Sequence, residues 1–598
     1  MRCFALLAAA GCVLLPLPAL AQQSTDIIRG RVTGPDSLPI AGARITAMSY
    51  LGEIAKSAAT DKNGRFQIIY VNGEGDYWIE VVKLGFTRRR FEIKKVGDEQ
   101  VMLADARLAS AVVQLDAVNI KGDNRALVNR NSAGTDVSGG DKSLTSSAAQ
   151  VQPDQAGNLA AMAATQPGIQ RIPGMDGQAD MFSAFGLSGD QNNTTFNGLG
   201  SGVSSVPPDA QVRVTFSQFP ADVSRSGFSG AQISVQSIPG SNYSYRGVSG
   251  YGTGPDLQWT DQGADSSGQK STTLRFGGNL RGPIQLDKSF YNASYSLQRT
   301  FADNLTLLNT SPLGLQAAGV AADSAARLLS ILSGKGVPVS LDNGPSLRAT
   351  DRYNYQTNID FTPSSSGAGN SLTLGVFGGY VHVQPTGAGV QMLTRTPSQT
   401  GHADGWSTSA SLLHSNYFWF GVLSQTTLGV AVTQQSSSPY LDYPTGTVRV
   451  GSLLGDGTTS IQNLSFGGGA APTEVSNLTL QLQNQLQWFS DDNRHTIKVA
   501  SSLSREHNTT DVGASLGTFS FNSLADLQAG MPAAFTRTLS SIHLPSDQVT
   551  AGVSVGDSWR PSTTVQVQYG IRADGNRFLY RPDFNAAVRD TFGIRNDV

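Results

Sequence analysis

The alternation of apolar and polar side chains with a period of two residues after Gly240 constrains the fold of this chain most strongly. In residues 478–488 the even positions are mainly Leu and end at Trp488, while the odd positions are Thr and Gln. Successive side chains of a strand point to opposite faces, so this segment has one apolar and one hydrophilic face. Leucines facing lipid, glutamines facing a wet lumen and a tryptophan at the interface are typical of outer-membrane β-barrels.

The same rhythm recurs often enough to predict a large part of a barrel wall. It gives about eleven strands up to residue 574, each near the ~9–11 residues that a tilted spanning strand needs. Short turns alternate with long connections near residues 301–348, 436–472 and 506–545, which favours long loops on one side of a membrane. We therefore predict a mainly β protein with a transmembrane antiparallel β-barrel in residues 241–598. A secreted β-sandwich or adhesin is the alternative, although its strands are usually about 5–6 residues long.

Length and charge agree with a β-rich protein of several domains. The 598 residues exceed a single ordinary core. Charged residues form 15% of the chain, compared with roughly 25% in an average soluble domain, and Gly is abundant at 66 residues. The formal net charge of −2 argues against a general nucleic-acid-binding surface, so we expect no nucleic-acid partner.

Residues 1–21 are typical of a cleaved export signal. Arg2 supplies the positive start, residues 5–20 are apolar, and Ala19 and Ala21 form an A-x-A cleavage site. The apolar stretch is short for a membrane anchor, which needs about 20 residues. A lipoprotein cleavage site at Cys12 is the weaker alternative.

Residues 22–108 predict a small N-terminal β-sandwich. Short strands are separated by turn signals, and residues 62–64 predict a hairpin connection. The segment contains Gly30-x-Val32, Pro39-Ile40-Ala41-Gly42-Ala43, Thr60-Asp61-x-x-Gly64-x-Phe66 and Gly85-Phe86. These motifs resemble the carboxypeptidase-regulatory-like domain, a module that is not itself catalytic. In this context it is similar to the N-terminal extension of TonB-dependent outer-membrane receptors of the Oar-like and SusC-like kind.

Residues 109–150 contain a candidate partner-binding segment and a linker. The run Leu115-Asp116-Ala117-Val118-Asn119-Ile120 resembles the TonB box that follows this domain in such receptors. An extended segment with alternating apolar residues suits β-strand addition to a partner sheet. The alternative is that this run forms the last strand of the preceding domain. Residues 124–150 are polar and rich in Ser, Gly and Asp, which predicts a flexible linker.

Residues 151–240 predict a mixed α/β domain. A helix is expected from Leu159 to the Pro167-Gly168 pair. Segments 185–198 and 220–235 resemble the plug of TonB-dependent receptors, and the second resembles its closing strand. The residues that carry this plug motif are Gly186, Ser188, Gly189, Asp190, Asn192, Asn197, Gly198, Gly227 and Gly230.

The predicted wall corresponds to about half of a 22-stranded barrel. An odd number near eleven does not close in the even-stranded manner of bacterial barrels. Strands ~4.8 Å apart and tilted by ~40° give a diameter of about 22 Å for eleven strands and about 44 Å for twenty-two. A plug of ~100 residues is more than about 30 Å across and fits only the larger barrel. We therefore expect the second half of the barrel to be absent from this sequence.

The sequence does not show the residue patterns typical of a catalytic site, a metal site or a cofactor-binding site. The six histidines are scattered without an H-x-x-x-H pair, and Asp491-Asp492 falls in a predicted turn. Both cysteines, Cys3 and Cys12, lie in the predicted leader, which leaves the mature chain without a disulfide or a thiol nucleophile. We expect neither an enzyme, a metal site nor a cofactor.

The resemblance implies energised import across the outer membrane of a Gram-negative bacterium, with the N-terminal domain in the periplasm. The implied partners are TonB with its inner-membrane energising complex, outer-membrane lipid, and a small-molecule, peptide or glycan ligand. The sequence does not identify the residues that bind this ligand. A barrel used for surface adhesion or assembly is the alternative of a different class, and a soluble secreted enzyme is a third.

Overall fold

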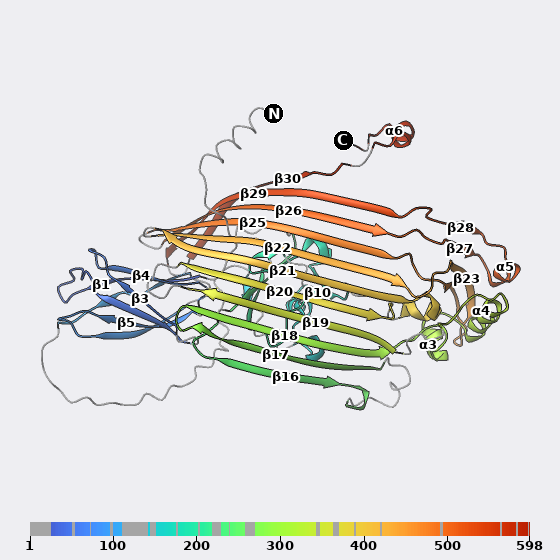
Figure 1. Ribbon diagram of the computed structural model, residues 1–598, viewed down its shortest axis with the longest axis horizontal. Helices are drawn as coiled ribbons and strands as arrows, with labels where there is room; N and C mark the ends of the chain where they lie inside the picture. The colour runs from blue at the N-terminus through green and yellow to red at the C-terminus, as the bar shows by residue number, and fades with distance from the viewer. Residues whose placement is uncertain are drawn as a thin grey trace.

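The computed structural model contains an N-terminal sandwich, an inner domain, one large antiparallel sheet and a cap at one end of that sheet (Figure 1). Together these parts make the protein mainly β, as predicted. The structure describes all residues except 1–24, 51–53, 72, 74, 96–99, 111–140, 144–150, 175–177, 201–203, 218–228, 239, 258–269, 342–346, 363–369, 388–389, 419–420, 491–493, 563–564, 582–583, 596 and 598. Among the described residues, the helices are too short or too polar to cross a membrane.

The N-terminal sandwich consists of two four-stranded sheets, which confirms the predicted architecture. One sheet has the order β4-β1-β7 with β8 also paired to β1, and the other has the order β3-β2-β5-β6. The predicted hairpin at residues 62–64 is wrong, because β3 pairs with β2 while β4 pairs with β1. The turn therefore carries the chain from one sheet to the other. The strands are β1 (Thr25–Thr33), β2 (Arg44–Ser49), β3 (Ala55–Ala59), β4 (Arg65–Val71), β5 (Asp76–Val82), β6 (Arg89–Lys94), β7 (Val101–Leu103) and β8 (Ala106–Arg107).

The inner domain, described within residues 141–240, is mixed α/β as predicted. Its sheet has the order β13-β12-β15-β14-β9, and β10 and β11 form a separate hairpin. The predicted helix begins at Leu159 but ends at Ala163, four residues before Pro167. Asn158 caps its start, its side chain accepting a hydrogen bond from the Ala161 backbone N–H at 3.0 Å. The elements are β9 (Asp141–Ser143), η2 (Pro153–Gln155), α2 (Leu159–Ala163), β10 (Ile169–Ile172), β11 (Met181–Ala184), η3 (Gly189–Gln191), β12 (Asn193–Phe196), β13 (Leu199–Gly200), β14 (Val212–Ser217) and β15 (Gln232–Ser237).

The large sheet contains eleven antiparallel strands, as the periodicity predicted. Its path runs from β16 to β30, and these two end strands do not pair with each other within the described residues. Most strands are longer than the predicted length, since they range from 9 residues in β16 to 21 in β29. They are β16 (Tyr245–Thr253), β17 (Ser271–Gln285), β18 (Ser289–Asp303), β19 (Leu347–Phe361), β20 (Ser371–Gln384), β21 (Gly401–Phe418), β22 (Val422–Pro439), β25 (Thr473–Phe489), β26 (His495–Val512), β29 (Ile542–Ser562) and β30 (Val565–Phe578).

The two faces of the large sheet differ in polarity as the sequence rhythm requires. On β25, Leu480 and Trp488 are 46% and 43% exposed on the outer face, whereas Gln485 and Gln487 are 1% and 0% exposed on the inner face. This placement contradicts a water-soluble fold in which the leucines would pack in a dry core. The inner domain covers the inner face of the sheet, where it lies behind the strands in Figure 1.

Aromatic side chains border the apolar outer face at two levels. Tyr353 on β19 stacks on Tyr380 of β20 at 5.8 Å between ring centroids, and Tyr380 is paired in register with Trp406. Phe361 on β19 and Trp488 on β25 lie near the opposite ends of their strands and are also exposed. Eight residues of β19 separate Tyr353 from Phe361, which is about 26 Å along the strand and about 20 Å along a barrel axis. This height approaches the ~25 Å apolar band of outer-membrane barrels.

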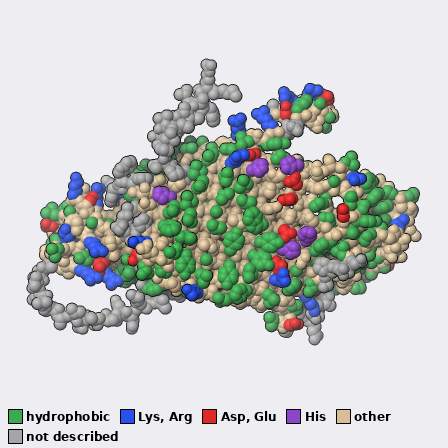
Figure 2. Space-filling model, in the orientation of Figure 1, with side chains coloured by type: hydrophobic (Ala, Val, Ile, Leu, Met, Phe, Trp, Pro, Cys, Tyr) green, Lys and Arg blue, Asp and Glu red, His purple; other side chains and the backbone are tan. Residues whose placement is uncertain are grey.

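Charged pairs lie beyond the aromatic level at the end of the sheet that carries the long loops. They include Arg299–Asp351, with Nε–Oδ1 at 2.5 Å, and Arg505–Asp547, with Nη2–Oδ2 at 2.6 Å. Figure 2 shows acidic and histidine side chains along one border of the hydrophobic band. The strands exceed the predicted length because they continue past this border toward the loops.

The long loops are not irregular but fold into a compact cap, which the sequence analysis did not predict. Its four-stranded sheet has the order β24-β23-β27-β28, and helices α3, α4 and α5 share a core with it that includes Leu328, Leu332 and Leu464. The three predicted long connections are confirmed, and two more, residues 254–270 and 385–400, were missed. The cap elements are α3 (Pro312–Ala317), α4 (Ala322–Gly334), η5 (Val390–Thr394), η6 (Pro397–Gln399), β23 (Thr445–Leu453), β24 (Thr459–Gly467), β27 (Thr518–Phe521), α5 (Leu524–Ala529) and β28 (Ala534–Thr536).

Candidate functional site

Asn192 of the predicted plug motif holds three segments of the inner domain together. Its side-chain Nδ2 donates hydrogen bonds to the Phe182 and Ser188 carbonyls at 2.8 and 3.1 Å. Its Oδ1 accepts one from the Ala231 backbone N–H at 2.8 Å. These bonds tie the β11 hairpin strand and the start of β15 to the turn before β12. The motif residue therefore has a structural role in the domain.

Asn197 fixes the turn between β12 and β13. It adopts a left-handed conformation with φ of 47°, which Asn tolerates better than most residues. Its side-chain Oδ1 accepts hydrogen bonds from both the backbone N–H and the hydroxyl of Ser237, each at 3.0 Å. Gly198 follows with φ of 83° and completes the turn. The pair thus links β12 to β15 across the inner sheet.

The remaining motif residues lie close to these two turns. Gly186 has φ of 80° after β11, and Ser188, Gly189 and Asp190 form the exposed turn that includes η3. Gly230 lies beside Asn192. The structure therefore brings eight of the nine motif residues into one part of the inner domain. Gly227 lies outside the described residues.

The inner domain contacts the inner face of the large sheet through a few specific groups. Phe196 of β12 stacks on Phe377 of β20 at 3.7 Å between ring centroids. The Gly200 backbone N–H donates to the Gln481 side chain on β25 at 3.0 Å. The glutamine face predicted to line a wet lumen thus faces the inner domain directly.

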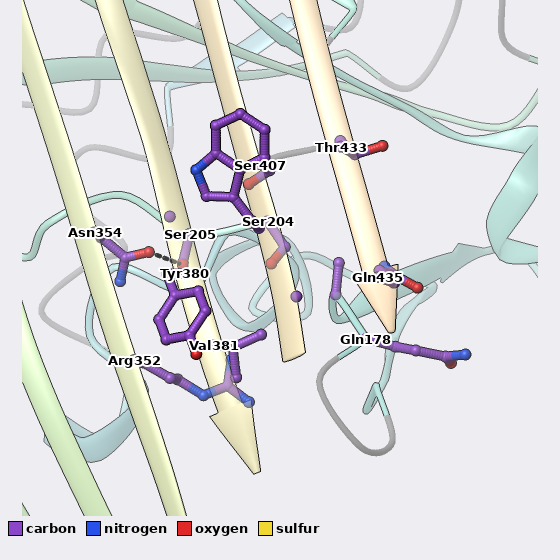
Figure 3. Close-up of a pocket in the computed structure, with 14 residues that line it drawn as sticks. Gln178, Ser204, Ser205, Arg352, Asn354, Tyr380, Val381, Ser407, Thr433 and Gln435 are labelled. Carbon is purple, nitrogen blue, oxygen red and sulfur yellow. Dashed lines mark hydrogen bonds between the residues drawn. The ribbon is translucent and has the colours of Figure 1, made fainter. Parts of the chain in front are cut away.

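A small polar cavity lies between the inner domain and the wall, toward the cap end of the strands (Figure 3). Its volume is about 60 Å³. Ser205 of the inner domain donates a hydrogen bond to the Asn354 side chain of β19 at 2.9 Å across one side of it. Other polar residues that line it are Gln178, Ser204, Arg352, Ser407, Thr433 and Gln435.

An ion-pair network next to this cavity positions the loop that contains Gln178. The Asp180 carboxylate accepts hydrogen bonds from Arg171 Nε at 2.8 Å and from the Gly174 backbone N–H at 2.9 Å. Asn158 donates to the same carboxylate at 2.5 Å. Burial alone would raise the pKa of Asp180, but these hydrogen bonds and the Arg171 charge outweigh it and lower the pKa below its ordinary value. Asp180 is therefore ionised at neutral pH.

The cavity offers a guanidinium, amides and hydroxyls, which suit a polar or anionic chemical group. Its volume corresponds to about two water molecules, far below the ~300 Å³ or more of a site for a complete ligand. It can therefore hold one group of a ligand. Sequence reasoning missed these residues, because Ser205 and Asn354 are 149 positions apart and no motif connects them.

Several predicted sites cannot be compared with the structure. The candidate TonB box, residues 115–120, and the cleavage residues Ala19 and Ala21 lie outside the described residues. In the part of the chain that is described, no group of three or more His, Cys, Asp or Glu residues could hold a metal ion. Histidines instead form single pairs with carboxylates of neighbouring strands, such as His382 with Asp404 at 2.8 Å.

Comparison with protein families identifies the N-terminal sandwich. Residues 27–109 match the family model of the carboxypeptidase regulatory-like domain. The sandwich is a regulatory-like domain. The resemblance drawn from its sequence motifs is thereby confirmed, and the two-sheet regulatory-like domain ends where the candidate TonB box segment begins. Among curated proteins, none matches the chain.

Solved structures similar to about three quarters of the chain include an outer-membrane transporter and several receptors. The outer membrane transporter YddB from Escherichia coli has 14% identity and a TM-score of 0.47, over 73% of this chain and 56% of that one. The siderophore receptor PirA from Acinetobacter baumannii has 13% identity and a TM-score of 0.42, over 73% and 57%. A ferric enterobactin receptor PfeA mutant from Pseudomonas aeruginosa has 12% identity and a TM-score of 0.41, over 74% and 58%. The chain thus spans little more than half the length of these proteins.

Proposed function

We propose that this chain belongs to a TonB-dependent outer-membrane receptor that imports a ligand through a plugged β-barrel. The observation that carries the proposal is a sheet with an apolar, aromatic-bordered outer face and a hydrophilic inner face covered by a separate domain. Such a wall suits lipid on one side and a polar transport path on the other. A path that is filled by a folded domain opens only when work is done on that domain.

The arrangement of turns and loops supports one orientation in the membrane. Outer-membrane barrels have short turns on the periplasmic side and long loops outside. The regulatory-like domain lies at the end with the short turns, and the cap lies at the opposite end (Figure 1). In this orientation the regulatory-like domain is periplasmic and the cavity beside Arg352 and Ser205 is on the outward side of the plug. A ligand that enters from outside would present a polar group to this cavity.

In this proposal TonB binds residues 115–120 and transmits the energy of the inner-membrane proton-motive force to the plug. These residues lie in the chain between the regulatory-like domain and β9 of the plug, so a pull on them reaches the plug through a short stretch of chain. TonB would hold this segment by pairing with it as an added β-strand.

The cap supports a second candidate function, surface adhesion or assembly. Leu453, Ile461 and Leu539 of the cap are 68%, 60% and 83% exposed, although the cap has a hydrophobic core of its own. Exposed apolar side chains on an outward-facing domain are typical of protein-binding surfaces. This candidate needs the barrel only as an anchor.

Cross-linking to TonB, which needs no known ligand, and a deletion assay together separate the two candidates. A photo-cross-linking residue at Val118 should capture TonB in living cells, and deletion of residues 115–120 should abolish uptake while the barrel still inserts. A second cross-linking residue at exposed Leu84, in the regulatory-like domain, is the matched control and should not capture TonB. If Val118 captures no TonB, or if the deletion changes only attachment of cells to a surface, the transporter proposal is wrong.

A further inference from the structure

Strands β1 and β4 of the regulatory-like domain each carry an isoleucine on both faces. In the antiparallel register of β1 and β4, Ile28 lies opposite Ile68, and both point into the core of the sandwich. The next pair, Ile27 with Ile69, must point away from that core, because successive side chains alternate. An outward pair of this kind would normally face water. Both residues are nevertheless 0% exposed.

The large sheet covers this outward pair. Ile27 and Ile69 form one hydrophobic cluster with Tyr417, Leu423 and Phe489, at the ends of β21, β22 and β25. Tyr417, Leu423 and Phe489 are buried, and they share the inner side of the wall with the buried Gln425 and Gln487, two residues along their strands. The outward face of the domain therefore rests against the inner face of the sheet at the short-turn end.

Polar contacts surround this cluster. Arg29, which is 3% exposed, donates hydrogen bonds to the Ser490 carbonyl and the Tyr417 hydroxyl, each at 3.3 Å. Gln425 donates from Nε2 to the Thr25 hydroxyl at 2.8 Å. A further bond reaches the inner domain, where Arg213 donates to the Gly73 carbonyl at 3.2 Å. The regulatory-like domain thus contacts both the wall and the plug.

We infer that the regulatory-like domain is a second, detachable closure of the transport path, held at the periplasmic mouth by its β1–β4 face. This inference rests on the proposed import function. Ligand released by the plug meets a mouth that this domain occupies, so the domain has to leave before the ligand can pass. The candidate TonB box follows the domain directly, and a pull on it acts on the domain as well as on the plug.

Unpaired polar atoms beside the contact explain why it can detach. In the described residues, Gln487 Nε2 and Oε1, Ser415 Oγ and Gln425 Oε1 are buried without a hydrogen-bond partner in the protein. Gln487 is paired in register with Leu423, and Ser415 with Gln425, so these atoms flank the cluster. Burying polar groups without partners opposes docking, whereas undocking returns them to water. The free energy gained by burying the apolar cluster is therefore offset by the cost of burying these polar atoms.

Cysteine accessibility tests the inference without any ligand. Because Cys3 and Cys12 are the two cysteines of the sequence, their replacement by Ala gives a background for single-cysteine variants of the full chain. In outer-membrane preparations, I27C should react with a water-soluble maleimide at least tenfold more slowly than V82C, at a position 42% exposed in the same domain. Adding I69S and Y417F should accelerate I27C at least fivefold. The matched control L84S, at a position 97% exposed, should leave the I27C rate unchanged.

A second measurement tests whether the domain closes the short-turn end of the transport path. Q425C on the inner wall should react slowly with a 5-kDa maleimide polymer in the full chain and rapidly after deletion of residues 25–109. Equal reaction rates for I27C and V82C would contradict docking of the domain on the wall. An I27C rate that stays unchanged when I69S and Y417F are added would also contradict it. Complete protection of I27C over a day would overturn detachment. Neither result depends on TonB or uptake, so the import proposal stands or falls separately through the Val118 cross-link.

Discussion

Gly230 and Asn192 lie so close together that a β-carbon on Gly230 would be 2.2 Å from the Asn192 side-chain oxygen. That oxygen cannot move away freely, because it accepts the Ala231 N–H while the same carboxamide donates to the Phe182 and Ser188 carbonyls. The plug motif therefore combines an asparagine that needs a fixed position with a glycine that leaves room for it.

Replacement of Gly230 by Ala should loosen the plug and leave the wall intact. The new methyl group displaces the Asn192 carboxamide, and we expect a loss of about 1–3 kcal/mol in plug stability. Urea titration followed by protease cleavage within residues 151–240 measures this loss. The control is G451A in the cap, where a β-carbon has open space within 4 Å. Equal effects of G230A and G451A would contradict the role given to Asn192.

Asn197 allows the hydrogen bonds and the backbone strain to be measured separately. N197A should destabilise the plug by about 2–4 kcal/mol, because it leaves the buried Ser237 N–H unpaired and places Ala in the left-handed region. N197G should recover about 1 kcal/mol of this, since Gly adopts that conformation without strain. The same protease assay in urea compares the two variants. If N197G is no more stable than N197A, backbone strain contributes nothing at this turn.

Leu480 tests the membrane-facing assignment of the outer face. L480R places a cation on the lipid side and should reduce the stability of the inserted barrel by about 2–4 kcal/mol. Q483R places the same charge on the inner face three residues away and should have a much smaller effect. Folding into lipid vesicles, followed by heat-dependent gel mobility, measures both. A larger effect of Q483R than of L480R would contradict the assignment.

Asp180 should make plug stability depend on pH in the acid range. Its folded-state pKa is lower than the ordinary value of 3.8, so its contribution is present above that value and is lost as the pH falls through the lower folded-state pKa. D180N should flatten this part of the profile, and D190N at an exposed turn position is the control. Urea midpoints between pH 2 and pH 6 measure the effect. A profile that is unchanged in D180N would show that the network is not coupled to folding.

Lys56 should make the stability of the regulatory-like domain depend on pH in the same direction, but in the alkaline range. The side chain is 4% exposed, its Nζ donates to the Ile69 carbonyl at 2.8 Å, and burial lowers its pKa from 10.5 to about 8. Between these values the unfolded chain binds more protons than the folded one, so stability should rise with pH by up to about 3 kcal/mol. K56M should abolish the rise, while K62M at an exposed position should retain it. Amide exchange of β4 in the full chain reports the change, and a rise that survives in K56M would refute it.

The sequence predicted the wall well because its signal is local and repeated. Alternation along residues 478–488 fixes which side chains face outward without knowledge of any distant contact. Strand ends were less predictable, because β29 and its neighbours continue past the apolar band with polar residues that also occur in loops.

Contacts between distant segments could not be predicted from local patterns. The doublets Ile27-Ile28 and Ile68-Ile69 place one isoleucine on each face of their strands, but they do not identify what the outward one contacts. The cap core joins Leu328 and Leu464 from different loops, and the cavity joins Ser205 to Asn354. The turn at residues 62–64 has hairpin chemistry, yet the pairing of β1 with β4 decides its actual course.

The bond from Arg29 to the Ser490 carbonyl joins residues 461 positions apart, and this separation sets an order of assembly. The regulatory-like domain has its own core and is synthesised first, long before β25 and its following turn exist. It can therefore fold while the wall is still an unfolded chain, and its outward Ile27–Ile69 pair stays uncovered until the wall has formed. During that interval the exposed Ile27–Ile69 pair is a surface that a chaperone would have to shield.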